Sequence, residues 1–163
     1  MLRRGILTFA AVLHLFLLDQ IVKAAAVYWL KDGLEVVVLK RFFSLKYVEN
    51  RGCAWGMLQG HVWLLAVFAA VALALFVWKR RAIFPPGRWG VAAEVMLYAG
   101  IIGNLVDRLW RGHVVDMFFF HWDAHEFPVF NVADSFITVA AGILIAFSFF
   151  VKGGDDPGRN DAA

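Results

Sequence analysis

Two aspartates in the last third of the chain have the setting that acid–base chemistry requires. Asp116 lies among large apolar residues in the segment 114–120, and Asp134 begins a long apolar run. Pro128 lies between them and prevents one continuous helix, so the chain can fold back and bring the carboxylates together. Neighbouring carboxylates share one proton, so one can deprotonate water while the other protonates a carbonyl. The pair predicts hydrolysis of a peptide bond.

Asp134 also has a purely structural interpretation. Acids are favoured in the first turn of a helix, and Asn131 three residues earlier is a good N-cap residue. Helix capping explains the position of Asp134 when it is considered alone. Acid–base catalysis better explains the presence of Asp134 and Asp116 together.

A further charged pair lies on the first apolar segment. Asp19 and Lys23 are four positions apart and therefore on one helical face. They form either a self-neutralising ion pair or a pair that positions substrate, since ionisable groups within membrane segments are usually functional.

Polar residues also mark the end of the third apolar segment. The spacing places Asn104 beside both Asp107 and Arg108, while the two charged residues point apart and need partners elsewhere. We expect them to lock the helix end to the following loop. Gly100 and Gly103 predict close helix packing.

Other polar residues are weaker candidates. His121 and His125 have a spacing that can bind zinc, but the zincin motif needs Glu directly after the first His. We therefore expect neither a metal nor another cofactor. The single cysteine, Cys53, excludes an internal disulfide. His14 and Glu94 are polar residues in apolar segments, and either could belong to a helix–helix hydrogen bond.

The elements that carry these residues belong to a membrane protein. Hydrophobic residues make up 61% of the 163 residues, well above the 45–50% that is typical of soluble domains. Apolar runs predict four spans, at roughly 5–29, 62–78, 89–105 and 132–151. A cleaved signal peptide is the alternative for the first run, but its apolar character resumes beyond Lys23, which favours a retained helix.

Between the first two spans the composition changes to that of strands. The segments 34–40 and 42–48 are rich in β-branched and aromatic residues, and a turn with two glycines follows at 49–56. We predict a small extramembrane β element at about 33–57, an acid-rich loop at about 108–130, and a disordered polar tail at 153–163.

Basic residues give these spans an orientation. With four spans both termini are cytoplasmic, and the positive-inside rule then places all the basic loops on one side. These residues are Arg3, Arg4, Lys79, Arg80, Arg81, Arg88 and Lys152. The β element and the acid-rich loop face outward. A net charge of +3 is too small and scattered to indicate nucleic-acid binding.

Two other functions compete with peptide hydrolysis. A proton-coupled transporter would use Asp19, Lys23, Glu94 and Asp107 as a relay, but all except Glu94 gather at the outer ends of the helices. A scaffold whose acids only cap helices is the non-enzymatic alternative.

Four ordered blocks of sequence resemble a known family, the lipoprotein (type II) signal peptidases of bacteria. The blocks are 19–23, 50–56, 103–116 and 130–135. Met117, Cys53 and Trp55 depart from the family's usual residues by apolar or small exchanges, which leave the carboxylates in place.

The resemblance implies a fold and an activity. The fold is an α-helical polytopic membrane protein with four transmembrane helices and a β-cradle between the first two, forming one peptidase domain over residues 1–152. The activity is that of an aspartyl endopeptidase, which cleaves diacylglyceryl-modified prolipoproteins before the lipidated cysteine. Asp116 and Asp134 would be catalytic. The supporting positions would be Asp19, Lys23, Asn50, Gly52, Asn104, Asp107, Arg108 and Asn131.

It also implies partners and a location. The protein would act on prolipoproteins in the bacterial cytoplasmic (inner) membrane as a monomer, with its site towards the outer leaflet. It would need no metal, and the cyclic peptide globomycin would inhibit it as a substrate mimic.

Overall fold

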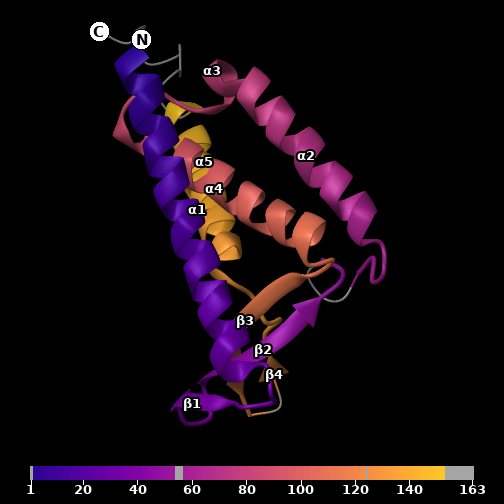
Figure 1. Cartoon of the computed structure of the whole chain (residues 1–163). Coiled ribbons are helices and arrows are strands. Elements are labelled where there is room, and N and C mark those ends of the chain that lie inside the picture. Colours follow the sequence, from indigo (N-terminus) through magenta and orange to yellow (C-terminus); the bar gives the residue numbers. More distant parts are fainter. Residues whose placement is uncertain (1, 54–56, 124, 153–163) are drawn as a thin grey trace, which may run out of the picture.

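Helices form most of the fold in the computed structural model. It describes residues 2–53, 57–123 and 125–152; the expected disordered tail at 153–163 and part of the predicted turn at 49–56 lie outside these ranges. The helices are α1 (Leu2–Leu30), α2 (Val62–Trp78), α3 (Arg80–Ile83), α4 (Arg88–Trp110) and α5 (Val132–Lys152) (Figure 1).

Three of these helices are long and apolar enough to cross a membrane. They are α1, α4 and α5, whereas α2 is apolar throughout but has only 17 residues. At 1.5 Å per residue α2 is roughly 25 Å long, slightly less than the hydrocarbon thickness of about 30 Å. The four predicted apolar segments are therefore all helical, and three of them meet the length expected of a span.

The helix α4 is the centre of the bundle. It contacts α1, α2 and α5, and it is the most buried of the three long apolar helices (Figure 1). Two of its glycines permit this packing, as predicted. A Cβ on Gly100 would lie 2.5 Å from the backbone oxygen of Ala133, and one on Gly103 would lie 2.6 Å from Oδ2 of Asp19.

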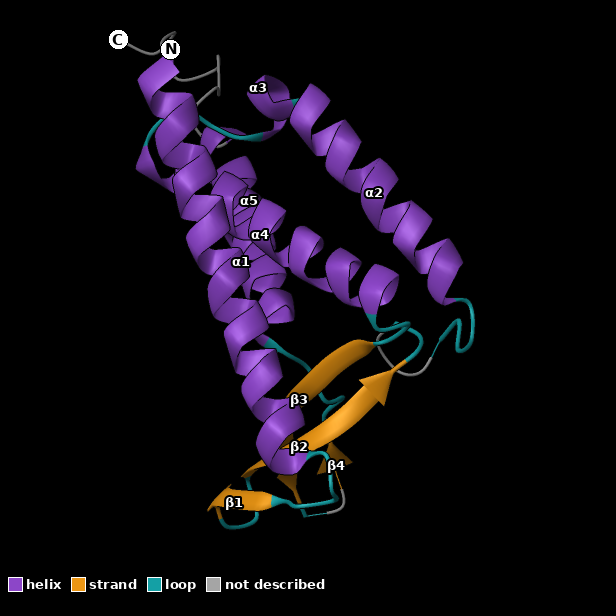
Figure 2. Cartoon of the chain, in the orientation of Figure 1, coloured by secondary structure: helices purple, strands orange, loops and turns teal. Residues whose placement is uncertain are grey.

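A four-stranded antiparallel sheet lies at one end of the bundle, remote from α3 and the start of α1 (Figure 2). Its strands, in spatial order, are β1 (Val36–Leu39), β2 (Phe43–Asn50), β3 (Val114–Trp122) and β4 (His125–Glu126). The predicted β element at about 33–57 is confirmed by β1 and β2, but the sheet is larger than predicted. Two of its strands come from the segment 108–130, which we expected to be a loop.

The composition of β3 explains this correction. The segment 114–122 is rich in valine and aromatic residues, which favour strands, and β2 supplies the partner that the local sequence does not reveal. Alternation along β3 then separates its side chains. Val115 and Met117 pack against Ala26 and Leu30 of α1, while Asp116 lies on the opposite face of the strand.

His14 and Glu94, the two residues considered for helix–helix hydrogen bonds, behave differently from each other. Buried Glu94 forms an ion pair with Arg80 at 2.7 Å, so the predicted link between helices is confirmed for Glu94. His14 instead hydrogen-bonds to the carbonyl of Ala10 in its own helix, at 2.7 Å.

Candidate active site

The pairing of β2 with β3 places Asn50 beside Asp116. Val48 is opposite Asp116 and Asn50 is opposite Val114, so the side chains of Asn50 and Asp116 are diagonal neighbours on one face. Asn50 donates an Nδ2–H bond to Oδ2 of Asp116 at 2.9 Å.

The segment before α5 brings Asn131 to the other oxygen of Asp116. Phe130 is bridged to β3, since its oxygen accepts the N–H groups of Met117 and Phe118 and its own N–H donates to Phe118. The next residue, Asn131, is fully buried and donates an Nδ2–H bond to Oδ1 of Asp116 at 2.6 Å. The chain thus folds back after Pro128, as the sequence predicted.

Asn131 also caps α5, as predicted. Its Oδ1 accepts the backbone N–H of Asp134 at 3.0 Å, and Asp134 Oδ2 accepts the backbone N–H of Asn131 at 3.2 Å. This reciprocal capping holds Asp134 at the first turn of the helix.

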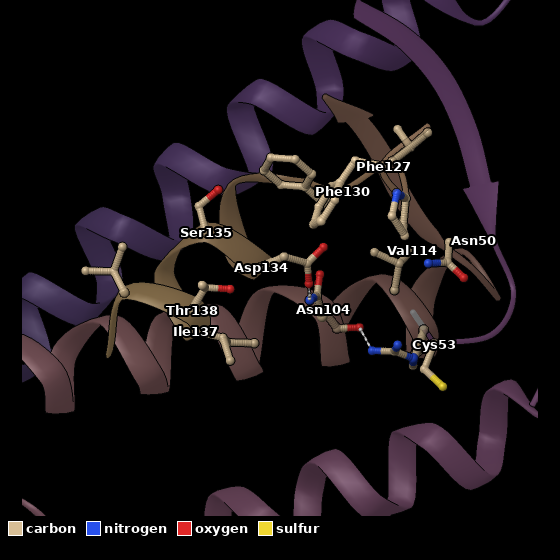
Figure 3. Close-up of a pocket in the computed structure, with 14 residues that line it drawn as sticks. Asn50, Cys53, Asn104, Val114, Phe127, Phe130, Asp134, Ser135, Ile137 and Thr138 are labelled. Carbon is tan, nitrogen blue, oxygen red and sulfur yellow. Dashed lines mark hydrogen bonds between the residues drawn. The ribbon is translucent and has the colours of Figure 1, made fainter. Parts of the chain in front are cut away.

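Asn104 completes the link between the two aspartates. It donates to Oδ1 of Asp134 at 2.7 Å and accepts a bond from Nδ2 of Asn131 at 3.2 Å. Figure 3 shows Asn104 and Asp134 pointing toward each other from α4 and α5. Asp116 and Asp134 therefore belong to one hydrogen-bonded network, joined through Asn131 and Asn104.

A fully buried cluster of charged side chains contacts this network through Asn104. The ammonium group of Lys23 lies 2.9 Å from Asp19 and 2.9 Å from Asp107, and it donates to Oδ1 of Asn104 at 3.0 Å. The Asp19–Lys23 ion pair predicted from their spacing is confirmed. Asp107 is the partner that the sequence could not identify.

The two buried carboxylates of this cluster hold the segments that carry Asp116 and Asp134. Asp19 accepts the backbone N–H of Ala133 at 2.9 Å, and Asp107 accepts the backbone N–H of Val115 at 3.3 Å. Each bonded residue immediately precedes one of the two site aspartates. Asp19, Lys23 and Asp107 therefore position the pair. A proton relay would require Glu94 to belong to this cluster. Glu94 is instead paired with Arg80.

Arg108 fixes the turn after β2. It donates to the backbone oxygens of Asn104 at 3.3 Å and Gly52 at 3.4 Å, while the N–H of Gly52 donates to Oδ1 of Asn50 at 2.9 Å. A Cβ on Gly52 would lie 2.5 Å from the backbone oxygen of Met57. The glycine therefore allows the close turn that orients Asn50.

Two cavities meet at the aspartates. One, of about 590 Å³, is lined by Asp134 and by apolar residues such as Ile137 and Val139 of α5. The other, of about 330 Å³, is lined by Asp116 and by Glu49 and other polar residues of the sheet. Both include Asn50, Cys53, Phe127, Pro128 and Val129 in their walls. The site thus has an apolar side and a polar side.

Burial raises the pKa of the Asp116 carboxyl group above its ordinary value. Its side chain is 1% exposed, and this desolvation, aided by the negative charge of Asp134, raises its pKa to about 7. The N–H groups of Asn50 and Asn131 act against that shift because they stabilise the charged form. Asp116 can therefore hold or release a proton near neutral pH.

Sequence reasoning missed some residues of the site. Gln20 donates to Asp19 at 3.1 Å and to Asp107 at 3.4 Å, and Arg111 pairs with Asp107 at 3.2 Å. The i, i+4 spacing of Asp107 and Arg111 was the available signal for that pair. Nothing local indicated that Cys53 lines both cavities.

The two histidines considered for zinc do not converge. Trp122 pairs with His125 and His121 pairs with Glu126, so His121 and His125 lie on opposite faces of the β3–β4 ribbon. Within the described ranges no three His, Cys, Asp or Glu residues are grouped as metal ligands would be.

Comparison with known proteins identifies the family. A family model described as signal peptidase (SPase) II matches residues 11–150, which include all the site residues described above. The chain belongs to the signal peptidase II family. It is therefore a peptidase, and with its long apolar helices it is a multi-pass membrane protein.

Curated members of the signal peptidase II family are similar over most of their length. The lipoprotein signal peptidase of Geobacillus kaustophilus is 34% identical, over 82% of this chain and 87% of its own. The lipoprotein signal peptidase of Streptococcus pneumoniae is 39% identical, over 82% of this chain and 86% of its own.

Solved structures share the fold. One, described as a bacterial membrane enzyme solved by the in meso method at 2.3 Å, superposes with a TM-score of 0.79 at 26% identity. The match covers 96% of this chain and 94% of the other.

Proposed function

We propose that this protein is an aspartyl endopeptidase that removes the signal peptide from diacylglyceryl-modified prolipoproteins, cutting just before the lipidated cysteine. The observation that carries the proposal is the network joining Asp116 and Asp134 through Asn131 and Asn104, in a chain of the signal peptidase II family. The two carboxylates are held between an apolar and a polar cavity, where a peptide can enter from the bilayer and leave toward water.

The reaction divides the roles of the two aspartates. We assign the shared proton to Asp116, whose pKa is about 7, and the negative charge to Asp134, which accepts bonds from Nδ2 of Asn104 and from the backbone N–H of Asn131. Asp134 takes a proton from water as the oxygen attacks the scissile carbonyl, and Asp116 donates its proton to the carbonyl oxygen. When the tetrahedral intermediate collapses, Asp134 returns its proton to the leaving nitrogen and the C–N bond breaks. As the carbonyl re-forms, one hydroxyl of the intermediate returns a proton to Asp116, which restores both aspartates.

The cavity walls suggest how the substrate lies. The larger cavity, lined by Ile137 and Val139 of α5 and by Val114 and Phe130, suits the apolar signal peptide. The diacylglyceryl chains stay in lipid and fix the cysteine near the dyad, which replaces a bulk encounter with a positioned one. The smaller cavity on the sheet suits the polar chain that follows the cysteine.

The membrane arrangement is part of the proposal. Residues 1–152 form one integral peptidase domain of the bacterial inner membrane, with α2 as a fourth span and both termini in the cytoplasm. The sheet and the dyad then lie at the outer leaflet, and α3, with its basic residues, lies at the cytoplasmic face. The protein works as a monomer without a metal, and globomycin blocks the cavity that receives the substrate.

The purified protein in liposomes tests this function. We expect it to cleave a precursor carrying diacylglycerol on its cysteine and to leave the same precursor without lipid uncut. Mass spectrometry should find the lipidated cysteine as the new N-terminus, at a rate that EDTA does not change. Equal cleavage of the unlipidated precursor, cleavage at another bond, or loss of activity that zinc restores would each contradict the proposal.

A further inference from the structure

A separate cavity lies at the end of the bundle remote from the sheet. Its volume is about 310 Å³, and its walls come from α1, α2, α3 and α4. In Figure 1, α1 and α2 diverge on either side of α4 from this end toward the sheet. None of the residues that line the cavity belongs to the network around Asp116 and Asp134.

The walls of this cavity form apolar stripes that follow the helices. Phe9 and Val12 belong to the stripe on α1, and Leu73 and Val77 are four positions apart on α2. Tyr98 and Ile102 of α4 form the floor, where the hydroxyl of Tyr98 is occupied by a bond to Phe76 O at 3.1 Å. Such an elongated apolar groove between membrane helices fits an alkyl chain.

One end of the groove is charged. Arg80 lines it and contacts both carboxylate oxygens of Glu94 through Nη2, at 2.7 and 2.9 Å. Beside this ion pair the side chain of Arg80 is still 41% exposed. Arginine's fixed fork of donors matches the oxygens of a phosphate group.

The neighbouring residues mark this end as the level of lipid headgroups. Lys79 lies over the ring of Trp78 at 4.2 Å and Arg88 over that of Trp89 at 5.3 Å. Both tryptophans are exposed, and exposed tryptophans gather at the membrane–water interface. With Arg81 also exposed, the mouth of the groove carries an excess of positive charge.

We propose that this groove binds an anionic phospholipid of the leaflet opposite the dyad. The phosphate contacts Arg80 and is attracted by the flanking cations, and one acyl chain lies between α1 and α2 on α4. The flanking cations favour a headgroup with net negative charge over a zwitterionic one. This site is distinct from the peptide-cleaving centre and does not depend on the roles of the aspartates.

Two glycines provide a matched test of the acyl-chain site. Gly5 lines the groove and Gly142 lies on α5, and a Cβ at either position would meet no atom within 4 Å. Leucine is also a better helix former than glycine, so neither substitution should weaken its helix. Gly5→Leu fills the groove, whereas Gly142→Leu adds the same side chain elsewhere.

Two double variants test the headgroup. Lys79→Gln with Arg81→Gln removes two exposed cations next to Arg80 and keeps its pair with Glu94. Lys31→Gln with Lys40→Gln removes two exposed cations near the sheet and serves as the control.

Native mass spectrometry of delipidated protein titrated with phosphatidylglycerol or phosphatidylcholine gives the readout. We expect tighter binding of phosphatidylglycerol, at least about fivefold weaker binding by Gly5→Leu, and wild-type binding by Gly142→Leu. The Lys79/Arg81 variant should lose about fivefold or more of the preference for phosphatidylglycerol, and the Lys31/Lys40 variant should keep it. Equal binding of the two lipids by the wild type, or equal binding by the two leucine variants, would overturn the proposal.

Discussion

Asn131 and Asp134 hydrogen-bond to each other in both directions, at 3.0 Å and 3.2 Å, across the start of α5. The same asparagine donates to Asp116 at 2.6 Å. The side chain of Asn131 therefore caps the helix that carries Asp134 and also orients Asp116. Because capping uses the oxygen of Asn131 and the bond to Asp116 uses its N–H, the structural and catalytic roles of this residue can be tested separately.

Substitution of Asn131 should affect stability and activity through different atoms. Asn131→Ala removes both the N-cap and the donor to Asp116, so we expect a stability loss of about 1 kcal/mol and a rate loss of about 10- to 100-fold. Asn131→Ser keeps a capping oxygen but lacks the amide N–H. It should restore the melting temperature without restoring kcat. Recovery of both by serine would show that capping alone matters.

Removal of Lys23 should destabilise the fold strongly. Lys23→Met leaves Asp19 and Asp107 buried without their shared cation, which costs about 3–5 kcal/mol. Lys31→Met, at an exposed position of the same charge, should change stability by less than about 0.5 kcal/mol. Thermal unfolding in detergent compares the two, and similar melting temperatures would contradict the role given to Lys23.

The spacing of residues along the sequence predicted only some of the contacts in the candidate site. The i, i+4 ion pair of Asp19 with Lys23, the cap at Asn131 and the close packing at Gly103 follow from rules that operate within a few residues. The bond from Asn104 to Asp134 and the contact of Lys23 with Asp107 join residues on different helices. No local pattern encodes these contacts, because they depend on how α1, α4 and α5 pack.

The strand β3 shows the same limit. Its composition favours a strand, but Asp116 in its centre and the distant position of β2 in the sequence made the segment resemble a loop. The family resemblance gave the site residues without giving this strand. Only the pairing with β2 shows why Asn50 lies beside Asp116.

Cys53 gives a chemical test of the cavity. It is the only cysteine in the chain, it is half-buried, and it lines both cavities. Alkylation by N-ethylmaleimide should narrow the site and lower the cleavage rate by about tenfold or more, since small displacements of a substrate are costly. Cys53→Ser should be active and resistant to the reagent. A fully alkylated protein, verified by intact mass, that keeps its rate would contradict the placement of the substrate.

The pKa of Asp116 predicts how activity depends on pH. Because Asp116 must be protonated to donate to the carbonyl and its pKa is about 7, kcat/KM should fall above about pH 7, by about tenfold per unit. Rates measured from pH 5 to 9 with a lipidated precursor test this expectation. A rate that stays constant up to pH 9 would contradict the assignment of Asp116 as the acid.

The pH dependence of the protein's stability gives an independent measure of the pKa of Asp116. The folded-state pKa of Asp116 is raised above 3.8, so between about pH 4 and pH 7 the folded protein binds more protons than the unfolded chain. Its contribution to stability is therefore most favourable at low pH and is lost as pH rises to about 7. Asp116→Asn should remove this decline, so parallel pH profiles of wild type and variant would contradict the raised pKa.

The cleavage rate of single Asp→Asn variants tests the central claim most directly. Asp116→Asn and Asp134→Asn should each lower the rate on a lipidated precursor by about 10³-fold or more while the protein still folds. Asp123→Asn, at an exposed position, is the matched control and should cleave at the wild-type rate. Near-wild-type turnover by either folded variant, Asp116→Asn or Asp134→Asn, would show that the two aspartates are not the catalytic pair.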